Sequence, residues 1–173
     1  MCQIMFMLTL FSCGDSGDKS VQVSLTDDLE LRRGDSIYTI KENGLYFQVT
    51  MPSDLMAYGD ALMNFNSSSG VFHIRDAAQQ IELQISPESR AWQEVLNDKQ
   101  RDALFTIQWV EKTESLAVCN RLLPDGSKHD QMLICLFESN TQRILVCSSP
   151  EGEYTEGDIK KMKSILSTLK LLS

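Results

Sequence analysis

Cys13 is the residue whose surroundings in the chain point most directly to chemistry. It follows a nearly unbroken apolar run over residues 2–11 and precedes a polar stretch, residues 14–20, that is rich in Gly, Ser and Asp. A cysteine thiol is a stronger nucleophile than the serine hydroxyls near it, which makes the Cys13 sulfur a candidate for covalent chemistry. The abrupt end of hydrophobicity at this point is the pattern of an export signal, and cleavage is expected.

The apolar run has the length of an export signal and not that of a membrane-spanning helix. A helix needs about 20 apolar residues to cross about 30 Å of hydrocarbon, and this run has about ten. A short apolar stretch that ends in small residues is typical of a cleaved signal peptide. No Lys or Arg precedes the run, and we expect a translation start upstream of Met1 to supply the missing basic residues.

The stretch Leu10-Phe11-Ser12-Cys13 resembles the lipobox of bacterial lipoprotein precursors. The resemblance implies a signal peptide over residues 1–12, a diacylglycerol and palmitate on Cys13, and a flexible tether over residues 13–20. It also implies anchorage in the bacterial cell envelope, and the outer membrane is favoured, with the periplasmic and surface faces both open. In the alternative interpretation, the first 13 residues are a buried strand or helix of a cytosolic protein and Cys13 is a core thiol.

Three further cysteines, Cys119, Cys135 and Cys147, follow the predicted tether. A symmetric hairpin around the turn sequence Pro124-Asp125-Gly126-Ser127 would place Cys119 opposite Cys135. A disulfide between these two is possible, because some antiparallel pairings bring cysteines to bonding distance. Three buried, reduced thiols are the favoured alternative, since an odd number cannot pair completely. The three lack the close CxxC spacing of a structural zinc site.

The two histidines, His73 and His129, are the natural candidates for a catalytic base. His73 falls in a predicted strand, where a packed or edge position is the favoured interpretation, and His129 stands beside Asp130 in a predicted turn. The serines at 67–69 have no Gly-x-Ser-x-Gly pattern around them, which favours a loop. We therefore expect no catalytic, cofactor-binding or metal-ligating residue, and no cofactor.

The composition is that of an acidic globular protein. Asp and Glu number 24 against 16 Lys and Arg, which gives a formal net charge of −8. Nucleic acid is an unsuitable partner, because no basic patch offsets this charge. Hydrophobic residues make up 42% of the 173 residues, enough for one core and for one domain, which we expect over residues 21–173.

Alternating apolar residues predict strands, and the strongest hairpin signal is Asn43-Gly44. Ser86-Pro87 is expected to begin a helix that runs to about residue 100 and places Trp92 in the core. Thr155-Glu156-Gly157-Asp158 resembles a capping box and predicts a C-terminal amphipathic helix. The strands are expected at residues 21–25, 36–41, 44–51, 61–65, 70–75, 79–85, 104–110, 115–123, 131–138 and 142–148.

This order of elements predicts an α+β fold: a predominantly antiparallel β-sheet covered by a middle helix and a C-terminal amphipathic helix. The later strands carry Leu, Ile, Val and Cys on both alternating faces. Such strands need cover above and below, so we expect the two helices to lie on opposite faces of the sheet.

Two further stretches resemble sequences of the PsbP-like domain group. They are Phe47-Gln48-Val49-Thr50-Met51-Pro52, at a strand end, and Ile165-Leu166-Ser167-Thr168-Leu169-Lys170, in the closing helix. With the order of elements, the resemblance covers most of residues 36–172 and implies the fold of that group. Its members act mainly as binding or assembly accessories, so the resemblance implies a role of that kind without identifying a site.

These features favour a noncatalytic envelope lipoprotein that contacts the membrane through its covalent lipid and binds another envelope protein. The alternative is a small-molecule or polysaccharide-binding module with a concavity between sheet and helix, lined by Tyr46, Phe47, Tyr58 or Phe72. An enzyme is the third and less favoured interpretation, because it would need His73 or His129 beside carboxylates in a deep pocket.

Overall fold

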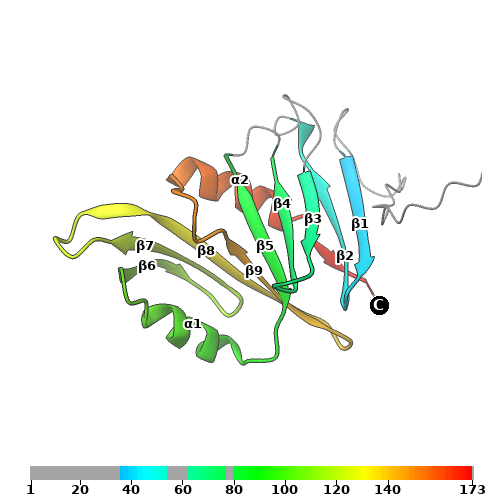
Figure 1. Ribbon diagram of the computed structural model, residues 1–173, viewed down its shortest axis with the longest axis horizontal. Helices are drawn as coiled ribbons and strands as arrows, with labels where there is room; N and C mark the ends of the chain where they lie inside the picture. The colour runs from blue at the N-terminus through cyan, green and yellow to red at the C-terminus, as the bar shows by residue number, and fades with distance from the viewer. Residues whose placement is uncertain (1–35, 54–61, 77–79, 173) are drawn as a thin grey trace, which may run out of the picture.

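The computed structural model describes residues 36–53, 62–76 and 80–172 (Figure 1). Within these ranges the chain forms two antiparallel sheets and two helices, which confirms the predicted α+β fold. The predicted signal peptide, Cys13, the tether and the strand at 21–25 lie outside the described residues. No helix of the described residues is long and apolar enough to cross a membrane.

The larger sheet has seven strands in the order β3-β4-β5-β9-β8-β7-β6, and every neighbouring pair is antiparallel. The smaller sheet has the order β1-β2-β10 and lies to one side of the larger one in Figure 1. The strands of the larger sheet are β3 (Leu62–Asn66), β4 (Val71–Arg75), β5 (Glu82–Pro87), β6 (Thr106–Lys112), β7 (Leu116–Leu122), β8 (Lys128–Glu138) and β9 (Arg143–Ser148). Those of the smaller sheet are β1 (Ser36–Glu42), β2 (Leu45–Met51) and β10 (Lys170–Leu171).

The β1–β2 hairpin turns at Asn43-Gly44, as predicted. Both residues have a positive φ, 53° for Asn43 and 81° for Gly44. This is the backbone that a two-residue turn between twisted strands requires, and Asn and Gly adopt it most readily. The turn sets the register of the hairpin, in which Tyr38 lies opposite Val49.

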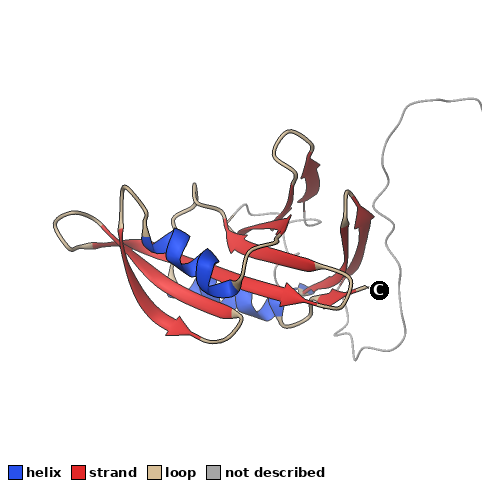
Figure 2. Cartoon of the chain, turned by 90° about the horizontal axis from the view of Figure 1, so that it is seen from below, coloured by secondary structure: helices blue, strands red, loops and turns tan. Residues whose placement is uncertain are grey.

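The two helices cover opposite faces of the larger sheet, as Figure 2 shows. Helix α2 (Glu156–Leu166) packs with the smaller sheet on one face, where Phe47 and Phe72 meet edge to face with ring centroids 5.7 Å apart. Helix α1 (Trp92–Gln100) lays Val95 and Leu96 on the other face. The sheet therefore separates two hydrophobic cores, which explains why its central strands are apolar on both sides.

The predicted start of the middle helix is wrong. Ser86 and Pro87 continue strand β5, opposite Leu145 and Ile144 of β9, and α1 begins at Trp92. Pairing with a central strand outweighs the local helix-start signal, which rests on only two residues. Trp92 is only partly buried, packed against the core under α1. Its indole N–H donates to the Thr113 carbonyl oxygen at 2.9 Å.

The predicted pairing of Cys119 with Cys135 is also wrong. Cys119 lies opposite Met132, and Cys135 lies opposite Leu116, because the β7–β8 turn is tighter than assumed and the register shifts after Arg121. Cys119 belongs to the core under α1 and Cys135 to the core under α2. The sheet separates these thiols, and both are free, as is Cys147.

Burial makes these thiols poor nucleophiles. It raises the pKa of Cys119 and of Cys135 to about 12, and that of Cys147 to about 11. Since the thiolate is the reactive form, these three cysteines act as small apolar core residues.

Candidate functional site

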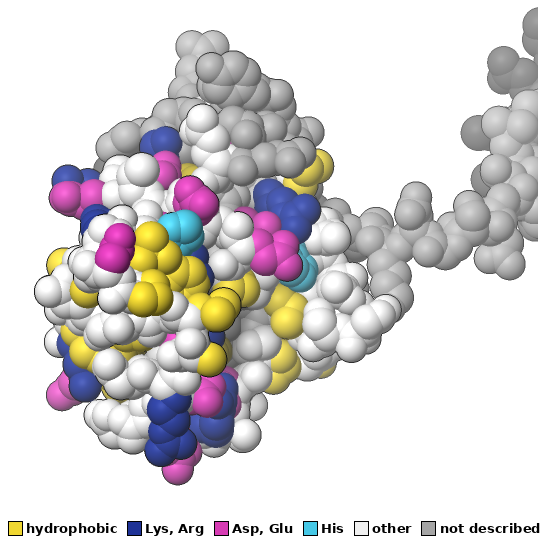
Figure 3. All heavy atoms as spheres, turned by 60° about the vertical axis from the view of Figure 1, so that its left-hand side comes forward, with side chains coloured by type: hydrophobic (Ala, Val, Ile, Leu, Met, Phe, Trp, Pro, Cys, Tyr) yellow, Lys and Arg dark blue, Asp and Glu magenta, His cyan; other side chains and the backbone are white. Residues whose placement is uncertain are grey.

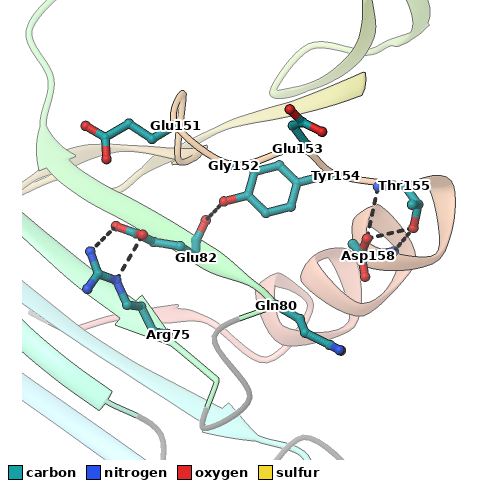
Figure 4. Close-up of a pocket in the computed structure, with 9 residues that line it drawn as sticks. All are labelled: Arg75, Gln80, Glu82, Glu151, Gly152, Glu153, Tyr154, Thr155 and Asp158. Atoms are coloured by element: carbon teal, nitrogen blue, oxygen red, sulfur yellow. Dashed lines mark hydrogen bonds and ion pairs between the residues drawn. The ribbon is translucent and has the colours of Figure 1, made fainter. Parts of the chain in front are cut away.

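A pocket of about 720 Å³ opens where the start of β5 meets the segment between β9 and α2 (Figure 4). We call residues 149–155 the linking loop, because it joins these two elements. The pocket is lined by Arg75, Gln80, Glu82, Glu151, Gly152, Glu153, Tyr154, Thr155 and Asp158. Four of the nine residues carry carboxylates and one carries a guanidinium, so the wall is polar and acidic.

Glu82, the first residue of β5, organises one wall of the pocket. Its Oε1 accepts a hydrogen bond from Arg75 Nη2 at 3.1 Å and lies 2.7 Å from His73 Nδ1. Arg75 Nε lies 2.9 Å from Glu82 Oε2, an ion pair without the alignment of a hydrogen bond. The three side chains come from two adjacent strands, where His73 faces Gln84 and Arg75 faces Glu82 in the ladder.

The charges of this cluster are mutually stabilised. Partial burial acts to raise the pKa of Glu82, but hydrogen bonds from Arg75 and His73 outweigh burial and lower the pKa below its ordinary value of 4.5. The same hydrogen bond with Glu82 raises the pKa of Arg75, and the charge of Glu151 adds to the effect. Glu82 is therefore an ionised structural partner near neutral pH, and its lone pairs are already in use.

Tyr154 closes the back of the pocket. Its hydroxyl donates to the Glu82 carbonyl oxygen at 3.4 Å, and burial raises its pKa to about 12. Its own carbonyl oxygen accepts from the Gln131 backbone N–H at 3.0 Å, which joins the linking loop to β8. The ring covers Gly152, as Figure 4 shows, and a Cβ at Gly152 would overlap it. The loop thus requires glycine at this position.

Arg121 and Asp130 hold the linking loop from its other side. They face each other across β7 and β8, and Arg121 Nε donates to Asp130 Oδ1 at 2.7 Å while Nη2 donates to Oδ2. Nη1 and Nη2 also donate to the carbonyl oxygens of Pro150 and Gly152, each at 3.0 Å. Both charged side chains are almost fully buried, with 6% and 1% of their surface exposed. Every guanidinium nitrogen has a partner, which buried charge requires.

The first turn of α2 forms the remaining wall. Thr155 Oγ1 accepts from the Asp158 N–H at 3.3 Å, and Asp158 Oδ2 accepts from the Thr155 N–H at 2.9 Å. This is the reciprocal capping box that the sequence predicts. Burial acts to raise the pKa of Asp158, but the bonds from Thr155 outweigh it and lower the pKa.

Two carboxylates of the pocket face solvent. Glu151 is exposed, and no ion pair joins it to a described residue. Glu153 is also exposed, with 74% of its side chain accessible, and it lies 3.8 Å from His129 Nε2, which is charged only when protonated. The pocket therefore has a back held by hydrogen bonds and ion pairs and an acidic, solvent-facing rim.

Exposed apolar side chains lie next to this rim. Leu104 is 75% exposed and Leu123 is 37% exposed. They flank one end of the β6–β7 pair, where Thr106 lies opposite Leu122. Phe105, the residue after Leu104, stacks on His129 at a centroid distance of 5.1 Å and is covered by the Arg121 guanidinium at 4.8 Å. We call Leu104, Phe105 and Leu123 the apolar end.

Comparison with known proteins identifies the fold. No family model matches the chain, and no curated protein is significantly similar to it in sequence. The solution structure of cyanobacterial PsbP (CyanoP) from Synechocystis sp. PCC 6803 matches with a TM-score of 0.50 at 10% sequence identity, over 86% of this chain and 98% of that one. The chain has a PsbP-like fold. The prediction made from two short stretches and the order of elements is thereby confirmed for the fold.

The two histidines occupy different parts of the PsbP-like domain. His73 joins the Glu82 cluster in the pocket wall, and His129 stacks on Phe105 beside the rim. The prediction that His129 and Asp130 lie in a turn is wrong, because both are residues of β8. Asp130 faces Arg121 and not the histidine. His73 lies beside Glu82, which Arg75 also engages, and His129 lies 3.8 Å from the exposed Glu153.

Of the aromatic residues proposed as the lining of a ligand concavity, the three that the structure describes do not form one. Phe47 and Phe72 are buried in the core under α2, where strand pairing and helix cover enclose them. Tyr46, near the start of β2, is 47% exposed. Tyr58 lies outside the described residues.

The pocket residues themselves were missed at the sequence level. Glu82 and Tyr154 are 72 residues apart, and Arg121 reaches Gly152 across 31 residues. The only local signal was the capping box, which locates one wall.

Proposed function

We propose that this chain is a noncatalytic accessory protein of the bacterial cell envelope, held at a membrane by a lipid on Cys13, whose folded part binds another envelope protein. The lipid supplies location, and the folded part supplies specificity. The location rests on the apolar run and on the lipobox-like Leu10-Phe11-Ser12-Cys13. The outer membrane is the favoured compartment.

The binding role rests on one observation, the contrast between the back and the rim of the pocket. At the back, Glu82 is joined to Arg75 and, through its carbonyl oxygen, to the Tyr154 hydroxyl. At the rim, Glu151 and Glu153 are exposed and free of a permanent cation partner among the described residues. A preformed surface with unused charge suits recognition, because binding then requires little ordering of the protein.

The location is tested by intact mass and membrane fractionation of the full chain in a bacterium that processes lipoproteins. Loss of residues 1–12 together with an added lipid mass is expected, and Cys13→Ser abolishes both. Cys2→Ser is the matched control and leaves the lipid in place. An unmodified, full-length, soluble product contradicts the lipoprotein assignment and returns residues 1–13 to the folded protein.

The partner-binding role is tested by affinity purification of the full chain from membranes of its native host. We expect one envelope protein to be recovered repeatedly, and its recovery to fall with Cys13→Ser, which removes the chain from the membrane. A chain that remains folded and membrane-bound but recovers no envelope protein contradicts this role.

A small-molecule or polysaccharide ligand is the second candidate, because a volume of about 720 Å³ lies within the range of about 300–1,000 Å³ typical of ligand sites. Such sites usually have apolar and aromatic walls, whereas Tyr154 is the one aromatic side chain among the residues that line this pocket. A thermal-shift screen of sugars, lipids and ions decides between the two, because a ligand that binds the native state raises Tm.

A further inference from the structure

Glu153 of the acidic rim adjoins the apolar end. His129 connects them, since it stacks on Phe105 of the apolar end and lies 3.8 Å from Glu153 of the rim. Figure 3 shows hydrophobic side chains gathered beside a histidine on this face, with acidic side chains close by and a hollow toward the neighbouring strands. A partner segment that crosses this face meets apolar and acidic groups in succession.

The charge of the rim is unbalanced. The pocket has Glu82, Glu151, Glu153 and Asp158 against Arg75. Glu82 is paired with Arg75, and Asp158 Oδ1 lies 3.7 Å from Lys161 Nζ, so two of the four carboxylates have cations nearby. Glu151 and Glu153 remain as net negative charge, and their positions are set by a loop that Arg121 and Tyr154 hold rigidly. Such charge favours an approaching cation.

The backbone of the apolar end is held by hydrogen bonds and ring contacts. The stack of His129, Phe105 and Arg121 fixes the backbone on either side of Phe105, and Asp102 Oδ1 accepts from the N–H groups of Leu104 and Phe105 at 2.8 and 3.0 Å. The loop is therefore rigid, and Leu104 is presented to solvent instead of folding back. Fixed, exposed apolar side chains mark contact sites more strongly than mobile ones.

We propose that the acidic rim and the apolar end are the docking surface for a protein segment in which an apolar side chain is followed by Lys or Arg. The apolar side chain packs against Leu104 and Leu123, and the cation lies beside Glu153, with Glu151 adding negative charge from the other end of the loop (Figure 4). This inference rests on the proposed binding function and names its surface. Partners that carry phosphate, such as nucleic acid or an anionic lipid surface, are disfavoured because the same carboxylates repel them.

The test is site-specific photo-crosslinking of the full chain in its native host. A benzophenone amino acid replaces Leu104 or Leu123 on the docking surface. In the control it replaces Tyr46, which is also exposed and lies near the start of β2 in the smaller sheet. Each is combined with the charge changes Glu151→Lys and Glu153→Lys. Glu114→Lys is the matched charge control, on an exposed residue in the loop after β6.

We expect Leu104 and Leu123, but not Tyr46, to crosslink one protein through a peptide that contains Lys or Arg near an apolar residue. The double charge change lowers the yield roughly tenfold, since each lost charge contact is replaced by repulsion, and Glu114→Lys leaves it unchanged. Thermal unfolding of each variant confirms that the fold is intact.

Three results overturn the inference. A crosslink from Tyr46 alone moves the interface elsewhere and leaves the proposed binding function standing. A crosslink to lipid, or to a peptide without a basic residue, shows that the occupant has a different chemistry. The absence of a crosslinked protein at all three positions, together with no partner in the affinity purification, removes the binding function itself.

Discussion

Two arginine–carboxylate pairs lie beside the linking loop, and they differ in their exposure to water. The Arg121–Asp130 pair is almost fully buried, and all the nitrogens of its guanidinium have protein partners. In the Arg75–Glu82 pair, 41% of the arginine side chain and 18% of the glutamate side chain are exposed, and the pair forms a pocket wall. The Arg121–Asp130 pair holds the loop through hydrogen bonds to two of its carbonyl oxygens, whereas the Arg75–Glu82 pair lines the pocket next to it.

The difference indicates which side of the loop is structural and which is available to a partner. Buried charge has lost its water, so every donor must find a protein partner and nothing is left for a ligand. A half-exposed pair keeps part of its hydration and contributes less to stability, and neighbouring charges such as Glu151 can remain unpaired. Variants on the two sides should therefore have unequal effects.

The largest effect is expected for Arg121→Met. The change leaves the Asp130 carboxylate buried without its partner and frees two loop carbonyls, which lowers the free energy of unfolding by about 3–5 kcal/mol. Chemical denaturation measures this loss. The double variant Arg121→Met/Asp130→Leu recovers much of it, because no buried charge is then left alone. A single variant as stable as the natural chain would remove the contrast between the two pairs.

Gly152→Ala is expected to have the next largest effect. A methyl group at this position overlaps the Tyr154 ring. The loop and the ring must shift to relieve the overlap, which should lower the free energy of unfolding by about 1–3 kcal/mol. Thermal unfolding reports the loss. Gly157→Ala is the matched control, since its added methyl group makes only ordinary contact with Thr155 Oγ1 at 3.5 Å and raises helix propensity. Equal effects at the two glycines would show that Tyr154 does not constrain the loop.

Glu82→Gln probes the half-exposed pair and should destabilise the protein by about 1 kcal/mol at pH 7, since the partner Arg75 is screened by water. Because folding lowers the pKa of Glu82 below 4.5, its carboxylate stabilises the protein above pH 4.5, and this contribution is lost as pH falls below that value. The free energies of unfolding of the natural chain and of Glu82→Gln should be measured by denaturation at pH 7, 5 and 3. The difference between them should be smallest at pH 3. A difference that is independent of pH contradicts the ionised pair.

The smallest effect on stability is expected for Glu151→Gln and Glu153→Gln. Both side chains face solvent and make no permanent ion pair among the described residues, so the free energy of unfolding should change by less than about 0.5 kcal/mol. Denaturation curves that overlay that of the natural chain are the expected result. A clear destabilisation would assign these glutamates to the fold and weaken their role in docking.

Features set by neighbouring residues could be predicted from the sequence. Asn43-Gly44 and the capping box at Thr155 were correct because each depends on a few consecutive residues. The prediction at Ser86-Pro87 failed because a distant strand, β9, extends β5 through these residues. The cysteine pairing failed because a small error in the length of the turn moves the Cys119 side chain to the other face of the sheet relative to Cys135.

By itself, the sequence determined the alternation of apolar and polar residues, the turns and the helix caps, which together specify an α+β fold with cover on both faces of the sheet. The sequence also contains the lipobox-like stretch that ends at Cys13, on which the predicted anchor rests. Only the tertiary structure decided the pocket. Arg121, Gly152 and Glu82 are far apart in the chain, and their contacts depend on strand register and on the order of strands in the sheet. Register is a cooperative property of the packed cores, so no local run of residues encodes it.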